Sequence, residues 1–438
     1  MKKIALIILV FCTCVSANWV QADSLRTKPR VIVMTDGEID DRSSMVRFLL
    51  YTNDIELLAI IETSSVYQRS GWSKDKWIQA QIDAYEQVYP NLVVHDPTYP
   101  TADELRNKLY IGDEDPDHLV VDRNSPRRLP GMDPVIDPAG WPDTPGSDKI
   151  VEILLESDPR PVHLQAWGGG NTAARAFHKL KTHYPGEYER AISKVVMYHI
   201  WYQDGAGHYI ERHHPGVTML LCHYFAGTWN YGSQRYTYRL VDERIKNNHG
   251  PLGALYPQDY ISEGDSPAFL HSIANGLRSH EDPTYGGWGG RFYKVYGNIY
   301  RDVSKASYWQ WIEYANRDFE ARMKWCVSRK FEEGNHAPLI RLSVPEDLTL
   351  RSGETVELEA DISDPDGQQC SVLWWQYKEA GTYESMIHIS DTRERKIRFV
   401  APVVTRPSTI HLIVEATDRG TPALTAFRRI ILTVLPAQ

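Results

Sequence analysis

Cysteine is scarce in this sequence, with five residues among 438. Cys12 and Cys14 lie within the first 22 residues, so the rest of the chain holds only Cys222, Cys326 and Cys370. These three are an odd number, lie far apart and lack the spacing of a metal-binding motif. We therefore expect neither a disulfide framework nor a cysteine-based metal site to hold the fold together.

Long apolar runs are also missing beyond the amino terminus, so no later segment is expected to cross a membrane. At the amino terminus Lys2 and Lys3 precede a short apolar run, and the small residues Ala17 and Ala22 follow at possible cleavage points. A buried first helix is the alternative, but this order is typical of a secretory signal peptide. Residues 1–22 are thus predicted to be a signal peptide, and the protein to be periplasmic or extracellular.

The chain has no excess of basic residues. Its formal net charge is −9, and loss of Lys2 and Lys3 with the signal peptide takes this from −9 to about −11. A negative charge of this size disfavours nucleic acid and anionic membranes as partners. A neutral or cationic small ligand, or a polysaccharide, fits better.

From residue 30 onward, strand-like and helix-like segments alternate, which predicts a mostly parallel, Rossmann-like α/β sheet covered by helices. An interval at residues 97–145, rich in Pro, Asp and Arg, is expected to be an elaborated surface loop near the functional site. The expected strands are residues 30–34, 55–61, 161–167 and 194–200, and the expected helices are residues 40–51, 74–89, 147–157, 171–184, 266–277 and 304–327.

The pattern changes after a boundary at residues 328–340. From Leu339 short alternating runs are separated by turn signals such as SDPDGQQ and DRGTPAL, which predicts a β-sandwich of roughly 100 residues with Trp374 or Trp375 in its core. We therefore expect an α/β domain over residues 23–334 and a sandwich domain over residues 338–438.

Four acids follow the first predicted strand, in the stretch TDGEIDD: Asp36, Glu38, Asp40 and Asp41. In an open α/β sheet this turn delivers its side chains to the ligand-binding edge. Capping of the next helix explains one or two of these acids. The others would repel one another, and a bound hard divalent cation would remove this conflict.

Two enzyme families have such a turn. Haloacid-dehalogenase-like phosphatases need a nucleophilic Asp at the position of Met34, so that resemblance fails. TDGEIDD is more similar to the Asp-rich motif of the nucleoside hydrolase superfamily, which Asp36, Asp40 and Asp41 match, whereas Met34 and Glu38 depart from it.

Two further motifs fit the same superfamily. QAWGGGNTAARA is similar to the family strand end whose backbone carbonyl binds calcium, here that of Trp167, and EGDSPAFL places Asp265 at the late metal-binding Asp. The resemblance therefore implies a Ca²⁺ site formed by Asp36, Asp41, Asp265 and the Trp167 carbonyl. With GGWGGRF, NHAP, WWQYKEAGTY and EATDRGTPALTA added, nearly the whole chain resembles secreted bacterial cellulose-binding proteins that combine a nucleoside hydrolase-like domain with an immunoglobulin-like carboxyl-terminal domain.

The resemblance implies a calcium-dependent hydrolase of glycosidic bonds, N-glycosyl or related, acting on a ribose-like or plant-derived glycoside. Asp36 would be the general base, and Asp40 would bind a sugar hydroxyl. Gly264 stands where better-known members have a His that helps the leaving group depart, and the Asn that binds the sugar after the second strand has no clear counterpart. Glu263 is a substitute acid or a structural residue, and Glu211 corresponds to a sugar-binding acid.

In GGWGGRF, Trp288 and Arg291 are candidates to contact the substrate, by stacking and hydrogen bonding, although glycines there also suit tight turns. Asp364, Asp366 and Asp418 are expected to form turns in the sandwich. The alternative to a hydrolase is a non-catalytic carbohydrate-binding protein, with cellulose as a candidate ligand, that keeps the metal and sugar site.

Overall fold

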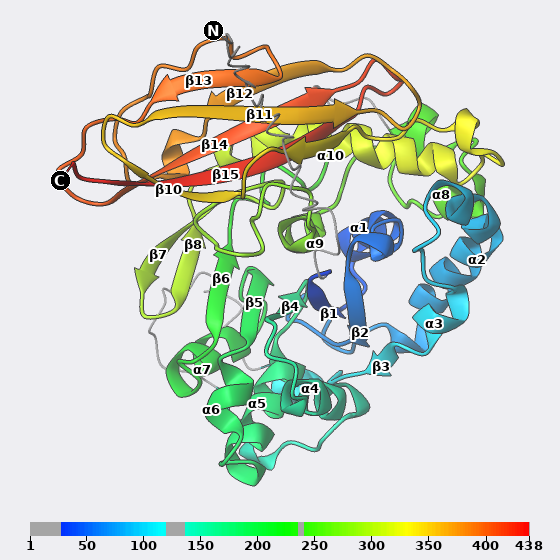
Figure 1. The fold of residues 1–438 in the computed structure, drawn as a ribbon. Helices are drawn as coiled ribbons and strands as arrows, with labels where there is room; N and C mark the ends of the chain where they lie inside the picture. Colours follow the sequence, from blue (N-terminus) through cyan, green and yellow to red (C-terminus); the bar gives the residue numbers. More distant parts are fainter. Residues whose placement is uncertain (1–27, 120–135, 235–240, 438) are drawn as a thin grey trace, which may run out of the picture.

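A computed structural model describes residues 28–119, 136–234 and 241–437, so the predicted signal peptide lies outside the described residues. An eight-stranded sheet forms the larger part, in the order β3-β2-β1-β4-β5-β6-β8-β7, and all neighbours are parallel except β7 and β8 (Figure 1). The strands are β1 (Arg30–Thr35), β2 (Glu56–Glu62), β3 (Leu109–Ile111), β4 (Val162–Ala166), β5 (Val195–Ile200), β6 (Thr218–Cys222), β7 (Phe292–Tyr296) and β8 (Ile299–Asp302). The predicted α/β sheet is confirmed.

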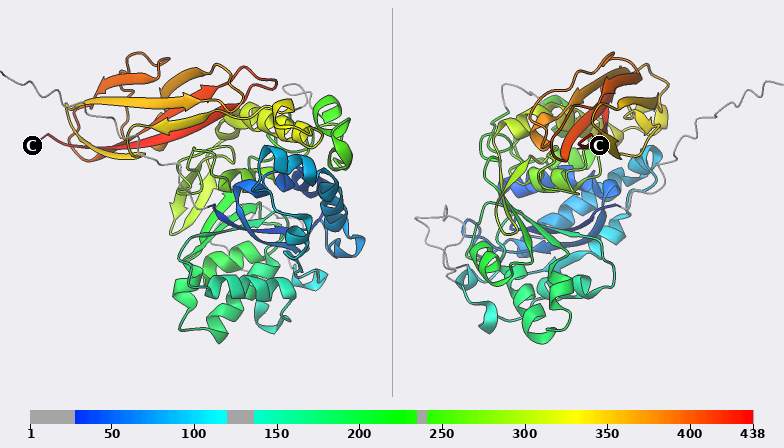
Figure 2. Two further views of the ribbon diagram at one scale, coloured as in Figure 1. Left: turned by 45° about the vertical axis from the view of Figure 1, so that its right-hand side comes forward. Right: turned by 60° about the vertical axis from the view of Figure 1, so that its left-hand side comes forward.

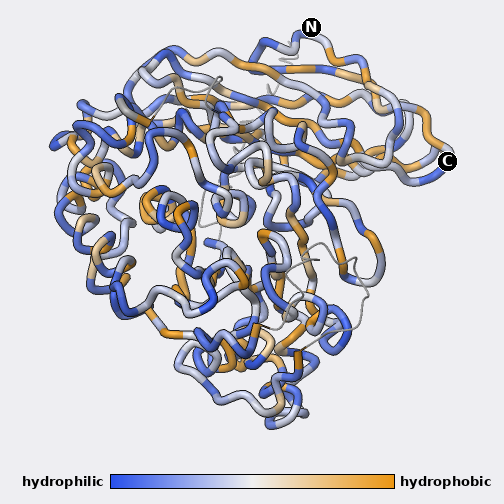
Figure 3. The backbone as a smooth tube through the Cα atoms, turned by 180° about the vertical axis from the view of Figure 1, so that it is seen from behind, coloured by the Kyte–Doolittle hydropathy of each residue, from blue (hydrophilic) through white to orange (hydrophobic). Residues whose placement is uncertain are grey.

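Helices cover both faces of this sheet, which is why its central strands are apolar on both sides. Val31 and Val33 of β1 pack in one core with α1, α2, α9 and α10, whereas Ile32 and Met34 pack in a second core with α4, α5, α6 and α7. Blue and orange residues alternate along the outer helices, as expected of helices with one buried face (Figure 3). The helices are α1 (Ile39–Leu49), α2 (Trp77–His95), α3 (Ala102–Arg106), α4 (Pro145–Leu155), α5 (Asn171–His183), α6 (Tyr188–Ile192), α7 (Ala206–His213), α8 (Gly250–Ala254), α9 (Ser266–Ser272) and α10 (Ala306–Trp325).

Three expectations need correction. The interval at residues 97–145 is not only a loop, because it contains α3 and the edge strand β3, which pairs with β2 through backbone hydrogen bonds. The helix expected at 74–89 continues past Pro90 to His95, and the one expected at 266–277 ends at Ser272. Within the described residues, no helix is both long and apolar enough to span a bilayer.

The carboxyl-terminal part is all β, in two sheets with the orders β10-β15-β14-β12 and β13-β11-β9 (Figure 2). Trp374 is buried in its core, as predicted, and the neighbouring Trp375 points to the other side, where its ring centroid lies 6.0 Å from that of Trp311 on α10. The strands are β9 (Leu339–Leu342), β10 (Asp347–Arg351), β11 (Thr355–Ser363), β12 (Ser371–Gln376), β13 (Lys396–Val400), β14 (Ser408–Thr417) and β15 (Thr425–Leu435).

The two parts are joined by buried polar contacts. Arg429 of β15 is fully buried and donates hydrogen bonds to the carbonyl oxygens of Leu277 (2.7 Å) and Gly286 (2.8 Å). Turn acids of the sandwich hold the connecting segment: Asp366 accepts a hydrogen bond from the His336 amide (2.7 Å), and Asp418 accepts one from the Asn335 side chain (2.9 Å). These contacts fix the sandwich against the segment between α9 and β7 and against the connecting segment that follows α10.

Candidate functional site

The acidic turn lies where β1 ends and α1 begins. Asp36 follows β1, Glu38 is the residue before α1, and Asp40 and Asp41 lie in the first turn of that helix. Gly37 between them has a φ of +79°, and a Cβ there would lie 2.8 Å from Nε1 of Trp77, so only glycine fits this turn.

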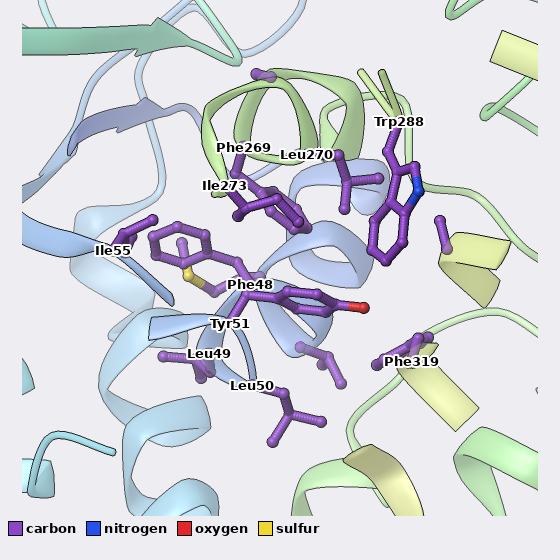
Figure 4. Close-up of a cluster of buried hydrophobic side chains, with 14 of the residues drawn as sticks. Phe48, Leu49, Leu50, Tyr51, Ile55, Phe269, Leu270, Ile273, Trp288 and Phe319 are labelled. Atoms are coloured by element: carbon purple, nitrogen blue, oxygen red, sulfur yellow. The ribbon is translucent and has the colours of Figure 1, made fainter. Parts of the chain in front are cut away.

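Packing of two helices brings a fourth Asp to this turn. Asp265 precedes α9, and α9 packs on α1 through Phe48 and Phe269, whose ring centroids are 5.4 Å apart, with Tyr51 beside them (Figure 4). Asp40, Asp41 and Asp265 can each direct one carboxylate oxygen so that these oxygens lie within 4.8 Å of one another. The site is therefore assembled from segments more than 220 residues apart in sequence.

These carboxylates lack positive partners: within the described residues no Lys, Arg or His side chain forms an ion pair with Asp36 or with these three. Three of their carboxylate oxygens are buried and have no hydrogen-bond partner among the described residues: Asp36 Oδ2, Asp40 Oδ1 and Asp265 Oδ2. Buried acceptors of this kind are costly unless a cation or donor satisfies them. Carboxylate oxygens are the ligands that hard divalent cations prefer, so the residues fit such an ion.

Burial is the largest cause of the raised pKa values at this site. It raises the pKa of Asp36, and burial with the neighbouring charge of Asp36 raises the pKa of Asp40 to about 7. The pKa values of Asp41 and Asp265 are raised well above the usual range by burial and by the other acids. Glu38 has its pKa raised to about 8, again by burial first and then by Asp36 and Asp40. A bound cation would reverse this balance and favour the ionised forms.

Asp36 and Trp167 lie next to this group and have partners of their own. The Asp36 amide donates a hydrogen bond to Asp41 Oδ1 (3.2 Å), and Asp36 Oδ1 accepts one from the Glu38 amide (3.3 Å). The Trp167 carbonyl accepts a hydrogen bond from Gln203 Nε2 (2.5 Å). The three acids that can share an ion thus include Asp40, expected to bind the sugar, and do not include Asp36, expected to bind the metal.

A pocket of about 230 Å³ opens above these acids. Its lining combines acidic and aromatic residues, and no Lys, Arg or His of the described residues lines it. Its lining residues are Glu38, Asp40, Asp41, Tyr67, Trp167, Ile200, Trp201, Gln203, Phe225, Asn230, Tyr231 and Asp265. Tyr67, Trp201, Phe225 and Tyr231 were not expected at the site, because no motif marks them in the sequence.

Four residues expected to bind the substrate do not line this pocket. Glu263 is fully buried and pairs with Arg47, and Glu211 on α7 accepts a hydrogen bond from the Tyr202 hydroxyl (2.5 Å). The other two, Trp288 and Arg291, belong to the loop that contacts the sandwich, where the Trp288 ring lies 6.5 Å from that of Phe427 and Arg291 packs against Gly286.

The local structure explains why position 264 is a glycine. A Cβ at this position would lie 2.3 Å from Oδ2 of Asp40, so any side chain there would displace Asp40. A side chain at 264, such as the His of the proteins that the sequence resembles, would therefore require another position of the Asp40 carboxylate.

The fold and the site together define a nucleoside hydrolase-like α/β domain followed by an all-β domain. Family models agree: that of the nucleoside hydrolase-like domain of cellulose-binding Sde182 matches residues 30–292, and that of the carboxyl-terminal domain of cellulose-binding protein Sde0182 matches residues 355–434. The chain belongs to this Sde182 nucleoside hydrolase-like family.

A solved structure agrees with this assignment. A nucleoside hydrolase-related hypothetical protein from Saccharophagus degradans, described as associated with carbohydrate metabolism, is 30% identical with a TM-score of 0.81, over 93% of this chain and 100% of that chain. A titin M10–obscurin-like 1 immunoglobulin complex matches 23% of this chain and 96% of that chain, with 16% identity and a TM-score of 0.16, which carries no argument. No curated protein matches the chain.

Proposed function

We propose that the protein is an exported, calcium-dependent hydrolase of glycosidic bonds, N-glycosyl or related, whose pocket binds a ribose-like or plant-derived glycoside. The observation that carries this proposal is the group of buried carboxylates, Asp40, Asp41 and Asp265, which have no cationic partner among the described residues and lie at the base of the pocket. Asp36 and the Trp167 carbonyl lie beside them as further oxygen donors. Bound there, Ca²⁺ would supply positive charge to hold the hydroxyls of the sugar and a water.

In this proposal, the acidic residues of the turn have different roles in the reaction. Asp36 Oδ1 is fixed by the Glu38 amide, and Asp36 Oδ2 has no hydrogen-bond partner in the described part of the chain, so Oδ2 is the atom that takes a proton from the attacking water. The neighbouring carboxylates stabilise the positive charge that develops on the sugar ring as the glycosidic bond breaks.

The family description and the charge support a carbohydrate partner. Both family models describe cellulose-binding proteins, and the described lining of the pocket has acids but no basic side chain for a phosphate. A periplasmic or extracellular location fits such a partner. We assign residues 23–334 to the hydrolase-like domain and residues 338–438 to an immunoglobulin-like accessory domain.

A second candidate function is carbohydrate binding without cleavage. It is favoured by the placement of Glu211 and Glu263, which are engaged elsewhere and do not line the pocket, so neither can protonate a leaving group there. Asp36 does not line the pocket either. A metal site that holds a sugar would then be used for recognition alone.

Reducing-sugar release from nucleosides, other N-glycosides and plant oligosaccharides, with calcium and with chelator, tests the proposal. Calcium-dependent release that Asp36→Asn abolishes would support the hydrolase, and release that survives in Asp36→Asn would remove the assigned base. Calcium titrations of Asp265→Asn should show lost binding. Asp148→Asn is the matched control, because Asp148 also lies in a first helical turn but is 53% exposed and away from the pocket. Calcium binding without release would favour the second candidate.

A further inference from the structure

Two aromatic residues of the pocket have an unusual backbone conformation. Trp201, directly after β5, has a φ of +58°, and Tyr231 has a φ of +42°. Non-glycine residues seldom adopt this left-handed region, and for a bulky side chain it is a true outlier. Strained residues of this kind persist where the surrounding structure holds them, often at functional sites. Both of these residues line the pocket.

The Trp201 conformation is held by defined contacts. Its amide donates a hydrogen bond to the Cys222 carbonyl (3.1 Å), and its ring meets that of Phe225 edge to face, with centroids 4.9 Å apart. Glycine would adopt this φ without strain, so glycine is the residue expected at this turn on backbone grounds alone. A Trp here places an indole ring at the pocket wall instead.

The rest of this wall is aromatic and accessible. The side chain of Tyr231 is 58% exposed and that of Tyr67 is 47% exposed, although large apolar side chains are usually covered. Glu38 and the acids Asp40, Asp41 and Asp265 line the same pocket. Aromatic rings provide flat apolar area that suits the C–H face of a sugar ring, and carboxylates suit its hydroxyls. A lining that combines both kinds of residue suits a sugar ring, which has an apolar face and polar hydroxyls.

We infer that Trp201 is a specificity-determining residue of this pocket, whose indole packs against the apolar face of an uncharged sugar ring with Tyr231 and Tyr67 beside it. This inference rests on the proposed function, because the hydroxyls of that ring would face the metal site. Since the described lining has four acids and no basic residue, the pocket selects against sugar phosphates and uronic acids, whose negative charge these acids would repel.

Calorimetric titration of the calcium-loaded protein tests this inference. The probes are neutral ligands (glucose, adenosine and methyl riboside) and their charged counterparts (glucuronic acid, adenosine monophosphate and ribose 5-phosphate). We expect at least one neutral probe to bind, and its charged counterpart to bind at least about tenfold more weakly. If no neutral probe binds, or if the charged counterpart binds equally well, the inference is overturned.

Two substitutions test the ring itself. Trp201→Gly removes the indole and relieves the backbone conformation, so we expect the neutral probe to bind roughly tenfold more weakly or worse, while Trp201→Phe stays within a few fold of the natural protein. Asp391→Gly is the matched control, because Asp391 has the same φ of +58° but lies exposed in the sandwich. Unchanged affinity in Trp201→Gly would refute the assignment.

Further measurements separate folding and metal binding from recognition. If Trp201→Gly does not fold, Tyr231→Gly gives the same test with little lost packing, because that ring is 58% exposed. Calcium affinity, titrated separately, should be unchanged in both variants. A natural protein that binds no calcium would refute the proposed function, whereas calcium and sugar binding that are insensitive to both variants would refute only this inference.

Discussion

The buried ion pair between Arg47 and Glu263 gives the sharpest test of how the acidic cluster of the proposed metal site is held in place. Arg47 Nε lies 2.6 Å from Glu263 Oε2, and both side chains are fully buried. Arg47 belongs to the last turns of α1, the helix that begins with the acidic turn, and Glu263 lies two residues before Asp265. The pair therefore ties together the two segments that carry the acidic cluster of the proposed metal site.

Replacing Glu263 with Gln should cost about 3–5 kcal/mol of unfolding free energy, because it leaves a buried guanidinium without its counter-charge. Arg47 keeps hydrogen bonds to Asn316 Oδ1 (2.8 Å) and the Ala315 carbonyl (3.1 Å), but neither is an anion. The side-chain amide introduced by Glu263→Gln would also place its N–H groups against the N–H donors of Arg47. Adding Arg47→Met to Glu263→Gln removes the buried charge, so the double variant should regain part of this loss.

Urea denaturation measures the free energy of unfolding of the natural protein, the two single variants and the double variant. Glu152→Gln is the matched control, because Glu152 pairs with Lys149 at 2.7 Å but is 66% exposed, so its loss should cost less than about 1 kcal/mol. Calcium affinity should also fall in Glu263→Gln, by about tenfold or more, as is usual when support behind a ligand is lost. The reasoning is refuted if Glu263→Gln keeps full stability and calcium affinity and loses only turnover, since Glu263 would then act on substrate.

Three further outcomes are expected. Calcium at 100 times its dissociation constant should stabilise the protein by about 2.7 kcal/mol in urea denaturation, and this gain should vanish in Asp265→Asn. Gly264→Ala should weaken calcium binding in titrations, because its methyl group would lie 2.3 Å from Asp40 Oδ2, whereas Gly140→Ala, with nothing within 4 Å, should not. Burial, with help from the charge of Arg429, lowers the pKa of His411 to about 3, whereas the pKa of a His in the unfolded chain is about 6.5. The contribution of the neutral His411 to stability is therefore full above pH 6.5 and is lost as the pH falls below that value. Between pH 7 and pH 5 this one group should cost about 2 kcal/mol, and His411→Asn should lose that part of the pH dependence.

The sheet and the acidic turn could be predicted because their signals are local. Apolar strands alternate with amphipathic helices, and the clustered acids of TDGEIDD conflict with one another unless an ion binds. The strand β3 was missed because its three residues are too few to show a period, and its pairing with β2 decides its conformation. Asp265 could be placed only through the family resemblance, since nothing local marks an acid before α9 as a ligand.

The pocket wall could not be predicted, because backbone conformation decides it. Trp201 and Tyr231 are two of many aromatic residues, and no local sequence pattern marks their positive φ values or their place in the pocket lining. For Glu263, left open above between a substitute acid and a structural residue, the relevant contact is also distant in sequence. Its position beside Asp265 suggested a role on substrate, but Arg47, 216 residues away in sequence, holds it inside the protein.

The glycine-rich loop GGWGGRF shows why a motif can be informative and still ambiguous. Its glycines do mark a close approach: a Cβ on Gly289 would lie 2.3 Å from the Pro267 carbonyl of α9, and one on Gly290 would lie 2.4 Å from the ring of Tyr308. The sequence predicts such an approach but not the partner, which is α9 and α10 instead of a ligand. Because Trp288 in the same loop packs on Phe427 of the sandwich, the carboxyl-terminal domain and the helix that follows Asp265 share one rigid support.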